Sequence, residues 1–179
     1  MPQKTPWTER RFIFDMPPSM FPNVLERLRG TPARVEERVR SVTAPVARKK
    51  LEGKWSIQET VGHLVELEPL WLGRLEDFGE GCEILRPADM SNKSTEAADY
   101  NAKHLAEILA GFRKVRSRLV EELERLDDRA IERTALHPRL NQPMRILDMM
   151  VFVAEHDDHH LARITELLRA FAGSGPRAK

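Results

Sequence analysis

The sequence predicts an all-α protein built as one four-helix bundle, and three observations support this prediction. Long segments repeat apolar residues at every third or fourth position, which is the period of one helix face. No segment alternates polar and apolar residues in the way that a half-buried strand does. The chain has 179 residues, which is the size of one domain with a single core. We therefore expect one domain over residues 1–179.

The two ends of the chain should differ from this helical body. Residues 1–22 contain five prolines, at positions 2, 6, 17, 18 and 22, and prolines oppose a continuous helix. The same segment contains aromatic and methionine side chains, which argue against plain disorder. We therefore expect an extended N-terminal arm held on the body by its apolar residues. At the other end, Gly173 should stop the last helix and residues 174–179 should form a loose tail.

The region after the arm predicts two helices in succession. Residues 23–29 predict a short helix that ends at Gly30. Thr31 followed by Pro32 matches an N-cap with proline at the first helical position, which predicts a new start. Valines then recur at spacings of four and three, so the first long helix is expected over residues 32–43.

The second long helix should begin immediately after Ser56. Ser56 and Glu59 match the capping box, in which each residue bonds the backbone of the other at a helix start. Pro69 lies inside the periodic pattern and should kink the helix or end its first half. The apolar residues that keep the helical spacing are Ile57, Val61, Leu64, Val65 and Leu67.

The longest apparent connection is residues 79–98, which carry turn-forming residues and little periodicity. Compact domains rarely keep so long a loop without a use. In a bundle it can cross from one end to the other, which makes the flanking helices parallel. The third long helix is expected over residues 99–126, and the last one, opened by Pro143, over residues 144–171.

The composition argues against several classes of protein. Lys and Arg number 29 and Asp and Glu number 28, for a formal net charge of +1, which suggests neither a nucleic acid nor an anionic membrane as partner. No apolar run approaches the roughly 18 residues of a membrane-spanning helix. The N-terminal residues lack the apolar core of a signal peptide, and the single cysteine, Cys82, excludes an internal disulfide. We expect a cytoplasmic protein.

The stretch AEHDDHHLARI in the last helix concentrates three histidines within a few residues. His156 and His160 are four positions apart and share a helix face, where they interrupt the apolar stripe. His159 lies about 100° away from His160 around the helix, and Asp157 and Asp158 are also rotated off the stripe. We interpret His156 and His160 as the pair that faces inward with a specific role, and His159 as a residue outside that pair.

A third histidine, His63, lies beside the apolar stripe of the second helix. One histidine from one helix and an i, i+4 pair from another can form a three-nitrogen site for zinc, nickel, copper or iron. Three protein ligands leave a position for water or substrate, as in catalytic zinc sites. The alternative is a set of hydrogen-bonded core histidines, which is the commoner use of a lone inward histidine. His104 and His137 have no partner at this spacing and are expected to be structural or exposed.

Two carboxylates lie near His63 in sequence. Glu59 is four residues before it on the same face and could accept a hydrogen bond from the ring nitrogen that does not bind metal. It could equally serve only the capping box with Ser56. Glu66, three residues after His63, is the other candidate, and a solvated helix face explains it equally well. Glu155 is expected at the surface.

Several segments of the chain resemble the DinB/YfiT-like superfamily. WSIQETVGHLVELE resembles the first metal-ligand segment of that family, and FVAEHDDHHLARITEL resembles its C-terminal segment, where the ligands are the first and last histidines of H-x-x-x-H. FPNVLERLRGTPARVEE and HPRLNQPMRILDMM are also similar, so the resemblance covers most of the chain. It implies an up-down-down-up four-helix bundle and a homodimer. It also implies a divalent metal, zinc first and nickel second, held by His63, His156 and His160.

The resemblance implies several activities on a small-molecule substrate. The superfamily includes thiol transfer with bacillithiol, reactions that depend on glutathione or mycothiol, and suspected hydrolases. The first hypothesis is a metal-dependent thiol S-transferase with a low-molecular-weight thiol as cofactor, because a coordinated thiol is held as the nucleophilic thiolate. The second is a metal-dependent hydrolase, since metal lowers the pKa of bound water to about 7. The third is a non-catalytic stress-response or binding protein with a structural metal.

Other residues could contribute to such a site. Cys82 lies in the long connection without a recognisable activating neighbour, so a free structural cysteine is expected there rather than a nucleophile. Four aromatic residues could line a substrate pocket, although core packing is their commoner use. These are Trp7, Phe14, Trp55 and Trp71.

Overall fold

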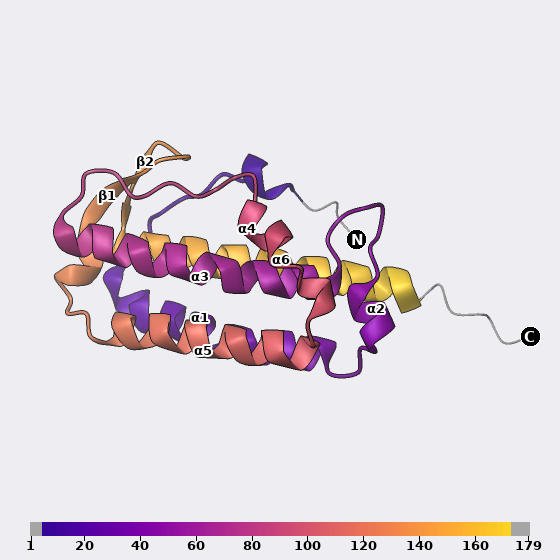
Figure 1. Cartoon of the computed structure of the whole chain (residues 1–179). Coiled ribbons are helices and arrows are strands. Elements are labelled where there is room, and N and C mark those ends of the chain that lie inside the picture. The colour runs from indigo at the N-terminus through magenta and orange to yellow at the C-terminus, as the bar shows by residue number, and fades with distance from the viewer. Residues whose placement is uncertain (1–4, 173–179) are drawn as a thin grey trace, which may run out of the picture.

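The fold is a four-helix bundle with up-down-down-up topology, as the sequence predicts (Figure 1). The structure is a computed structural model that describes residues 5–172. Helices α3 and α5 run parallel to each other, and α1 and α6 run the opposite way. Each helix packs against its parallel partner, and in addition α1 packs against α5 and α3 packs against α6. The long helices are α1 (Phe21–Val39), α3 (Ile57–Glu80), α5 (Leu105–Glu124) and α6 (Ile146–Ala172).

Shorter elements complete the described part of the chain. The expectation that no strand would occur is wrong, because residues 134–145 form an antiparallel hairpin in which Ala135 pairs with Met144. Strands of four residues are too short to show an alternating pattern. Pro143 therefore lies in a strand, and the last helix begins at Ile146 instead. The shorter elements of the described chain are α2 (Ala44–Arg48), α4 (Lys93–Ala97), β1 (Thr134–His137), β2 (Gln142–Arg145) and the 3-10 turns η1 (Trp7–Glu9), η2 (Pro18–Met20), η3 (Tyr100–Ala102) and η4 (Ala130–Glu132).

Helix α1 runs without a break through Gly30, Thr31 and Pro32, so the predicted end and new start are wrong. Pro32 has no N–H to bond the carbonyl of Leu28, four residues earlier. Nη1 of Arg116 on α5 donates to that carbonyl instead, at 3.2 Å. The Thr31 hydroxyl does not cap a helix and donates to the Arg27 carbonyl at 3.1 Å. A contact from another helix therefore replaces the hydrogen bond whose loss is part of the cost of proline inside a helix.

Helix α3 begins as predicted and ends later than predicted. Oγ of Ser56 accepts a hydrogen bond from the Glu59 N–H at 3.1 Å, and the Glu59 carboxylate accepts one from the Ser56 N–H at 2.8 Å. Both bonds of the capping box are present. Pro69 does not end the first half of the helix, which continues to Glu80. Gly81 stops it in the left-handed conformation, at φ 74°.

The connection after Gly81 lies along α3 and contains the short helix α4 (Figure 1). Two glycines on α3 make room for it. A Cβ added at Gly62 would lie 2.2 Å from the Tyr100 ring, and one at Gly73 would lie 2.0 Å from the Arg86 guanidinium. The two glycines are eleven residues apart, which is about three turns and places them on one face. The third long helix begins only after this contact, so it is shorter at its start than the predicted 99–126.

A buried ion cluster joins three of the helices. Arg116 on α5 is 1% exposed, and it binds two carboxylates that are 0% exposed, Glu68 on α3 at 2.6 Å and Asp157 on α6 at 2.5 Å. Asp157 is therefore buried on a face of α6 other than the histidine face. Burial raises the pKa of Glu68 to about 7, against the opposing charge of Arg116. Burial alone would lower the pKa of Arg116, but the charges of Asp157 and Glu68 outweigh it and raise that pKa.

The ends of the chain and its surface complete the description. The arm that precedes α1 packs aromatic side chains on the core, with Trp7 and Phe152 ring centroids 4.9 Å apart. The expected tail at 174–179 and the stop at Gly173 lie outside the described residues.

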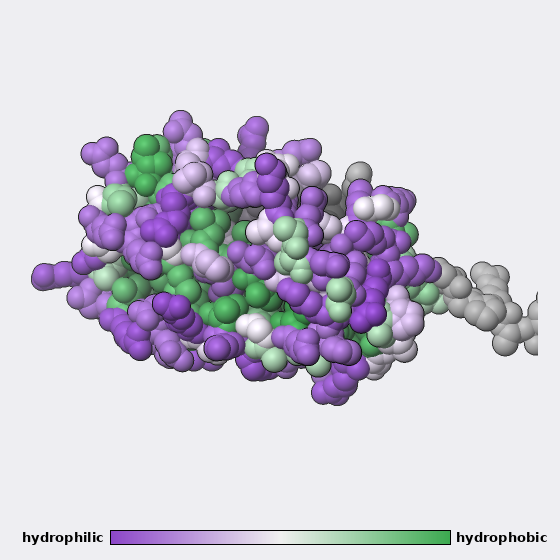
Figure 2. All heavy atoms as spheres, in the orientation of Figure 1, coloured by the Kyte–Doolittle hydropathy of each residue, from purple (hydrophilic) through white to green (hydrophobic). Residues whose placement is uncertain are grey.

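No helix in residues 5–172 is both long enough and apolar enough to cross a membrane. On the face shown in Figure 2, hydrophilic residues surround a band of hydrophobic ones between α3 and α5.

Candidate metal centre

The structure brings together the three histidines that the sequence singles out. His63 comes from α3, and His156 and His160 come from successive turns of α6, which packs against α3. One ring nitrogen from each lies within 4.8 Å of the other two. The Nε2 atoms of His156 and His160 are 3.1 Å apart. The His63 ring centroid is 4.8 Å from that of His160.

Burial keeps the imidazoles of His63 and His156 in the form that binds metal. His63 is 5% exposed and His156 is 4% exposed. Burial lowers the pKa of His63 to about 4. It also lowers the pKa of His156 well below its ordinary value, and the neighbouring His63 acts in the same direction. A neutral ring offers a lone pair, which is what a metal ion requires of histidine.

The geometry fits a divalent cation. Nε2 of His156 and Nε2 of His160 face each other at 3.1 Å, a distance that fits either a hydrogen bond between the two rings or a cation bound by both. Two nitrogens bound to zinc at about 2.0–2.1 Å with a tetrahedral angle would lie about 3.3 Å apart. The observed separation is close to that value. The residues present therefore fit a metal with three nitrogen ligands and at least one position left open.

Thr95 on α4 supports His63, and nothing in the sequence pattern pointed to it. Its Oγ1 lies 3.1 Å from Nδ1 of His63, and the threonine is 2% exposed. When Nδ1 carries the proton and donates it to Thr95, the lone pair of Nε2 is free for a metal. Nδ1 of His156 is buried and has no hydrogen-bond partner in residues 5–172, so His156 lacks the support that Thr95 gives to His63.

Neither candidate carboxylate contacts His63. Glu59 bonds the Ser56 N–H and forms an ion pair with Lys50 at 2.8 Å. Burial alone would raise the pKa of Glu59, but the Lys50 and Ser56 hydrogen bonds hold it below its usual range. Glu66 accepts a hydrogen bond from the Tyr100 hydroxyl at 2.5 Å. Glu59 is therefore a helix cap, and Glu66 fastens the long connection to α3.

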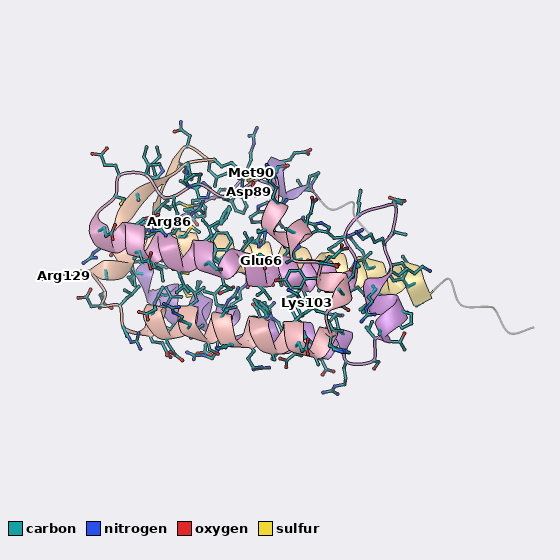
Figure 3. All side chains as sticks on the ribbon, in the orientation of Figure 1. Glu66, Arg86, Asp89, Met90, Lys103 and Arg129 are labelled. Carbon is teal, nitrogen blue, oxygen red and sulfur yellow. The ribbon has the colours of Figure 1, made fainter. Side chains whose placement is uncertain are left out.

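The three histidines line one end of a cavity of about 430 Å³, a volume typical of small-molecule sites. Trp7, Trp55 and Trp71, which are all the tryptophans of the chain, lie in its wall. The Trp55 ring centroid is 4.6 Å from that of His63. Phe14 packs against the core outside this cavity. Asp89 and Met90, labelled on the long connection in Figure 3, contribute to the wall beside α4.

Other residues named from the sequence have mixed positions. His159 lines the cavity next to Trp7, at a centroid distance of 5.7 Å, and is not part of the three-nitrogen group. His137 was expected to be structural or exposed. It is 2% exposed and also lines the cavity, together with Arg74 and Arg139, which no sequence pattern had indicated. His104 is exposed at the start of α5. Cys82 does not line the cavity.

Comparison with known proteins identifies the family. A profile of the DinB superfamily matches residues 20–164. Among solved structures, the chain is similar to YfiT from Bacillus subtilis, described as a probable metal-dependent hydrolase with an unusual four-helix bundle topology. The two share 22% sequence identity with a TM-score of 0.80 over 92% of this chain and 94% of that one. No curated protein matches. With a match over most of its length, the chain belongs to the DinB superfamily.

Proposed function

We propose that this protein is a metal-dependent enzyme whose divalent ion is held by His63, His156 and His160, and that it transfers a low-molecular-weight thiol to an electrophile. The observation that carries the proposal is the placement of three imidazoles together in the wall of a cavity that also has aromatic side chains. A divalent ion bound there would keep a thiol in its nucleophilic thiolate form. Zinc is the first candidate and nickel the second.

Side chains around the ion would orient one ligand and exclude water. Thr95 fixes the orientation of His63, and the tryptophans exclude water from the reacting end of the cavity. In the reaction the thiol gives its S–H proton to water, and its sulfur forms a bond to an electrophilic carbon. The leaving group departs with the electron pair of the bond that breaks. No acidic or basic side chain is required at the carbon.

The scarcity of acidic side chains in the cavity wall favours thiol transfer over hydrolysis. Among the cavity-lining residues in the described part of the chain, Asp89 is the one acidic side chain. Its carboxylate already accepts hydrogen bonds from the backbone N–H groups of Ser91 and Lys93 at the start of α4. A hydrolase needs a group that removes a proton from the attacking water, whereas a metal-bound thiol is deprotonated on binding.

Metal-dependent hydrolysis is the second candidate, and two observations favour it. YfiT is described as a probable metal-dependent hydrolase. His159 lines the cavity beside the candidate metal ligands, where an imidazole could accept the proton of a water. In that case the ion would lower the pKa of its bound water to about 7.

Metal analysis and activity screening test the proposal together. Purified protein should hold about one divalent ion per chain, and His160→Ala should lose it. His159→Ala is the matched control, because it removes a neighbouring cavity imidazole and should keep the ion. The loaded protein should then be screened with low-molecular-weight thiols and an electrophilic acceptor, and in parallel with ester substrates. Ester cleavage without thiol transfer would select the hydrolase. Equal metal loss in both variants would overturn the ligand assignment.

We also propose that the protein is a homodimer. A symmetric pair is the commonest assembly of soluble chains, and the hydrophobic band between α3 and α5 in Figure 2 is a surface that a partner could cover. Sedimentation at micromolar concentration should give twice the mass of one chain. A single-chain mass there would contradict the dimer.

A further inference from the structure

The end of the cavity away from the metal ligands is built from groups that carry or can carry positive charge. Arg74, His137 and Arg139 all line it. Arg74 is 1% exposed, a rare position for an arginine unless it is paired. Its Nε donates to the Arg86 carbonyl at 3.0 Å, and its Nη1 lies 3.1 Å from Nε2 of His137.

In residues 5–172 no carboxylate lies within ion-pair distance of these two arginines. Neither Arg74 nor Arg139 forms an ion pair there, and Nη2 of Arg139 is buried without a hydrogen-bond partner. Asp77 is the acidic group that acts on Arg74. Its carboxylate is already held by Arg86, at 2.7 Å from both the backbone N–H and the guanidinium. The buried guanidinium of Arg74 and the partly buried one of Arg139 therefore line the same cavity, and Nη2 of Arg139 is a buried donor without a partner there.

The ring of His137 faces a hydrogen-bond donor on each side. Its Nε2 faces Nη1 of Arg74, and its Nδ1 lies 3.2 Å from the backbone N–H of Leu140. A neutral imidazole has one nitrogen that accepts, and a protonated one has none. One of the two contacts is therefore a donor facing a donor. If Nδ1 accepts from Leu140, the Nε2–H and the Arg74 guanidinium both point their hydrogens at the same region without an acceptor.

An oxygen anion in the cavity would resolve this arrangement. It would accept from Arg74 and from His137 Nε2–H together, while Nδ1 of His137 accepts from Leu140. The unpartnered Nη2 of Arg139 would supply a further donor. Charge-assisted hydrogen bonds from guanidinium groups are among the stronger polar contacts in proteins.

Aromatic side chains separate this cationic end from the histidine end. Phe152 lies one turn before His156 on α6, and its ring centroid is 5.1 Å from that of His137. The Arg139 guanidinium lies 5.9 Å from the same ring. Nη1 of Arg74 also reaches Sδ of Met149, seven residues before His156, at 3.8 Å. Seven residues correspond to about 10 Å along a helix, so the two ends suit a ligand with an apolar middle.

We propose that Arg74, His137 and Arg139 form an oxyanion-binding subsite, so that the substrate carries a carboxylate or phosphate group at one end. Its reactive group would lie about 10 Å away, at His63, His156 and His160. The role of the reactive end rests on the proposed function, whereas the oxyanion subsite does not require a metal.

Tryptophan fluorescence tests this subsite, because all three tryptophans lie in the cavity wall. Metal-free and metal-loaded protein should each be titrated with benzoate, with inorganic phosphate and with benzamide, the neutral analogue of benzoate. Arg139→Gln should weaken binding of the preferred anion by about tenfold or more. Arg129→Gln is the control, since Arg129 is exposed and outside the cavity lining (Figure 3). Far-UV circular dichroism confirms that each sample is folded.

Each outcome decides the proposal. Benzoate or phosphate binding that is weakened in Arg139→Gln, kept in Arg129→Gln and absent with benzamide supports it, and the tighter of the two anions identifies the substrate class. Equal binding of benzoate and benzamide, or an unchanged affinity in Arg139→Gln, overturns it. Anion binding to protein that takes up no metal would leave the subsite standing and remove the proposed metal-dependent function.

Discussion

Nδ1 of His63 on α3 lies 3.1 Å from Oγ1 of Thr95 on α4, so the long connection between α3 and α5 touches the candidate metal centre directly. Partners of this kind orient a histidine ligand and select the tautomer that binds metal. The connection is therefore part of the site. Its position depends on Gly62, the residue before His63, because a side chain there would meet Tyr100.

Replacing Thr95 with valine should weaken metal binding without removing it. Valine has nearly the shape of threonine but cannot accept the proton of His63 Nδ1, and loss of such a contact typically costs about 10- to 100-fold in affinity. Competition titration with a chelating dye measures this affinity. Ser94→Ala, an exposed neighbour on the same helix, should behave as wild type. Wild-type affinity in Thr95→Val would show that the contact does not orient the ligand.

Replacing Arg116 with methionine should strongly destabilise the fold. It leaves Glu68 and Asp157 as two buried carboxylates without a cation, and it removes the donor that satisfies the Leu28 carbonyl opposite Pro32. Breaking a buried ion pair from one side costs about 3–5 kcal/mol. Urea unfolding measures the free energy of unfolding. Arg118→Met, an exposed position on α5, should change it by less than about 0.5 kcal/mol. A loss of similar size in both variants would contradict the role given to the cluster.

The candidate metal ligands could be predicted from the sequence because their signal is periodic. His156 and His160 interrupt an apolar stripe four residues apart, and helix phase alone places them on the face toward α3. Thr95, His137 and Arg139 could not be predicted in this way. They lie in the long connection and in the β-hairpin, where no period links a residue to a face, and only the folded chain brings them to the cavity.

The error at Pro32 has a different origin. The local rule for proline is sound, but Arg116 satisfies the carbonyl that Pro32 leaves without an N–H. A signal for this contact was present in the sequence. Arg116 lies four residues after Phe112 and three before Leu119, both fully buried, so it occupies an inward position of α5. A charged residue at such a position requires buried partners.

Acid should destabilise the metal-free protein in a defined pH range. Burial lowers the pKa of His63, and burial with the charge of Arg74 lowers that of His137, each from 6.5 to about 4. Between these two pH values the unfolded chain binds protons on these histidines that the folded chain excludes, so the stability that they contribute is complete above 6.5 and falls as the pH decreases toward 4. Glu68, with its pKa raised to about 7, acts in the opposite direction, but it is one group against two. Urea unfolding at a series of pH values measures the slope.

Two variants separate the buried histidines from general acid effects. His63→Gln should flatten part of the slope, because one proton fewer is taken up on unfolding. His104→Gln, at an exposed position, should keep the wild-type slope. An identical slope in wild type and His63→Gln would mean that His63 is not held neutral by burial.

Removing the metal should leave the helices intact, because the contacts that form the bundle do not involve the three histidine nitrogens. The capping box of α3, the Arg116 ion cluster and two sets of buried apolar residues are all made by protein groups alone. Domains that unfold without zinc lack cores of this size. Three neutral ligands also leave the charge of the ion uncompensated, which favours an anion such as thiolate as the fourth ligand. Chelation should therefore leave the far-UV circular dichroism nearly unchanged and abolish thiol binding in calorimetry. Loss of helix on chelation, together with thiol binding that does not depend on metal, would identify the ion as structural.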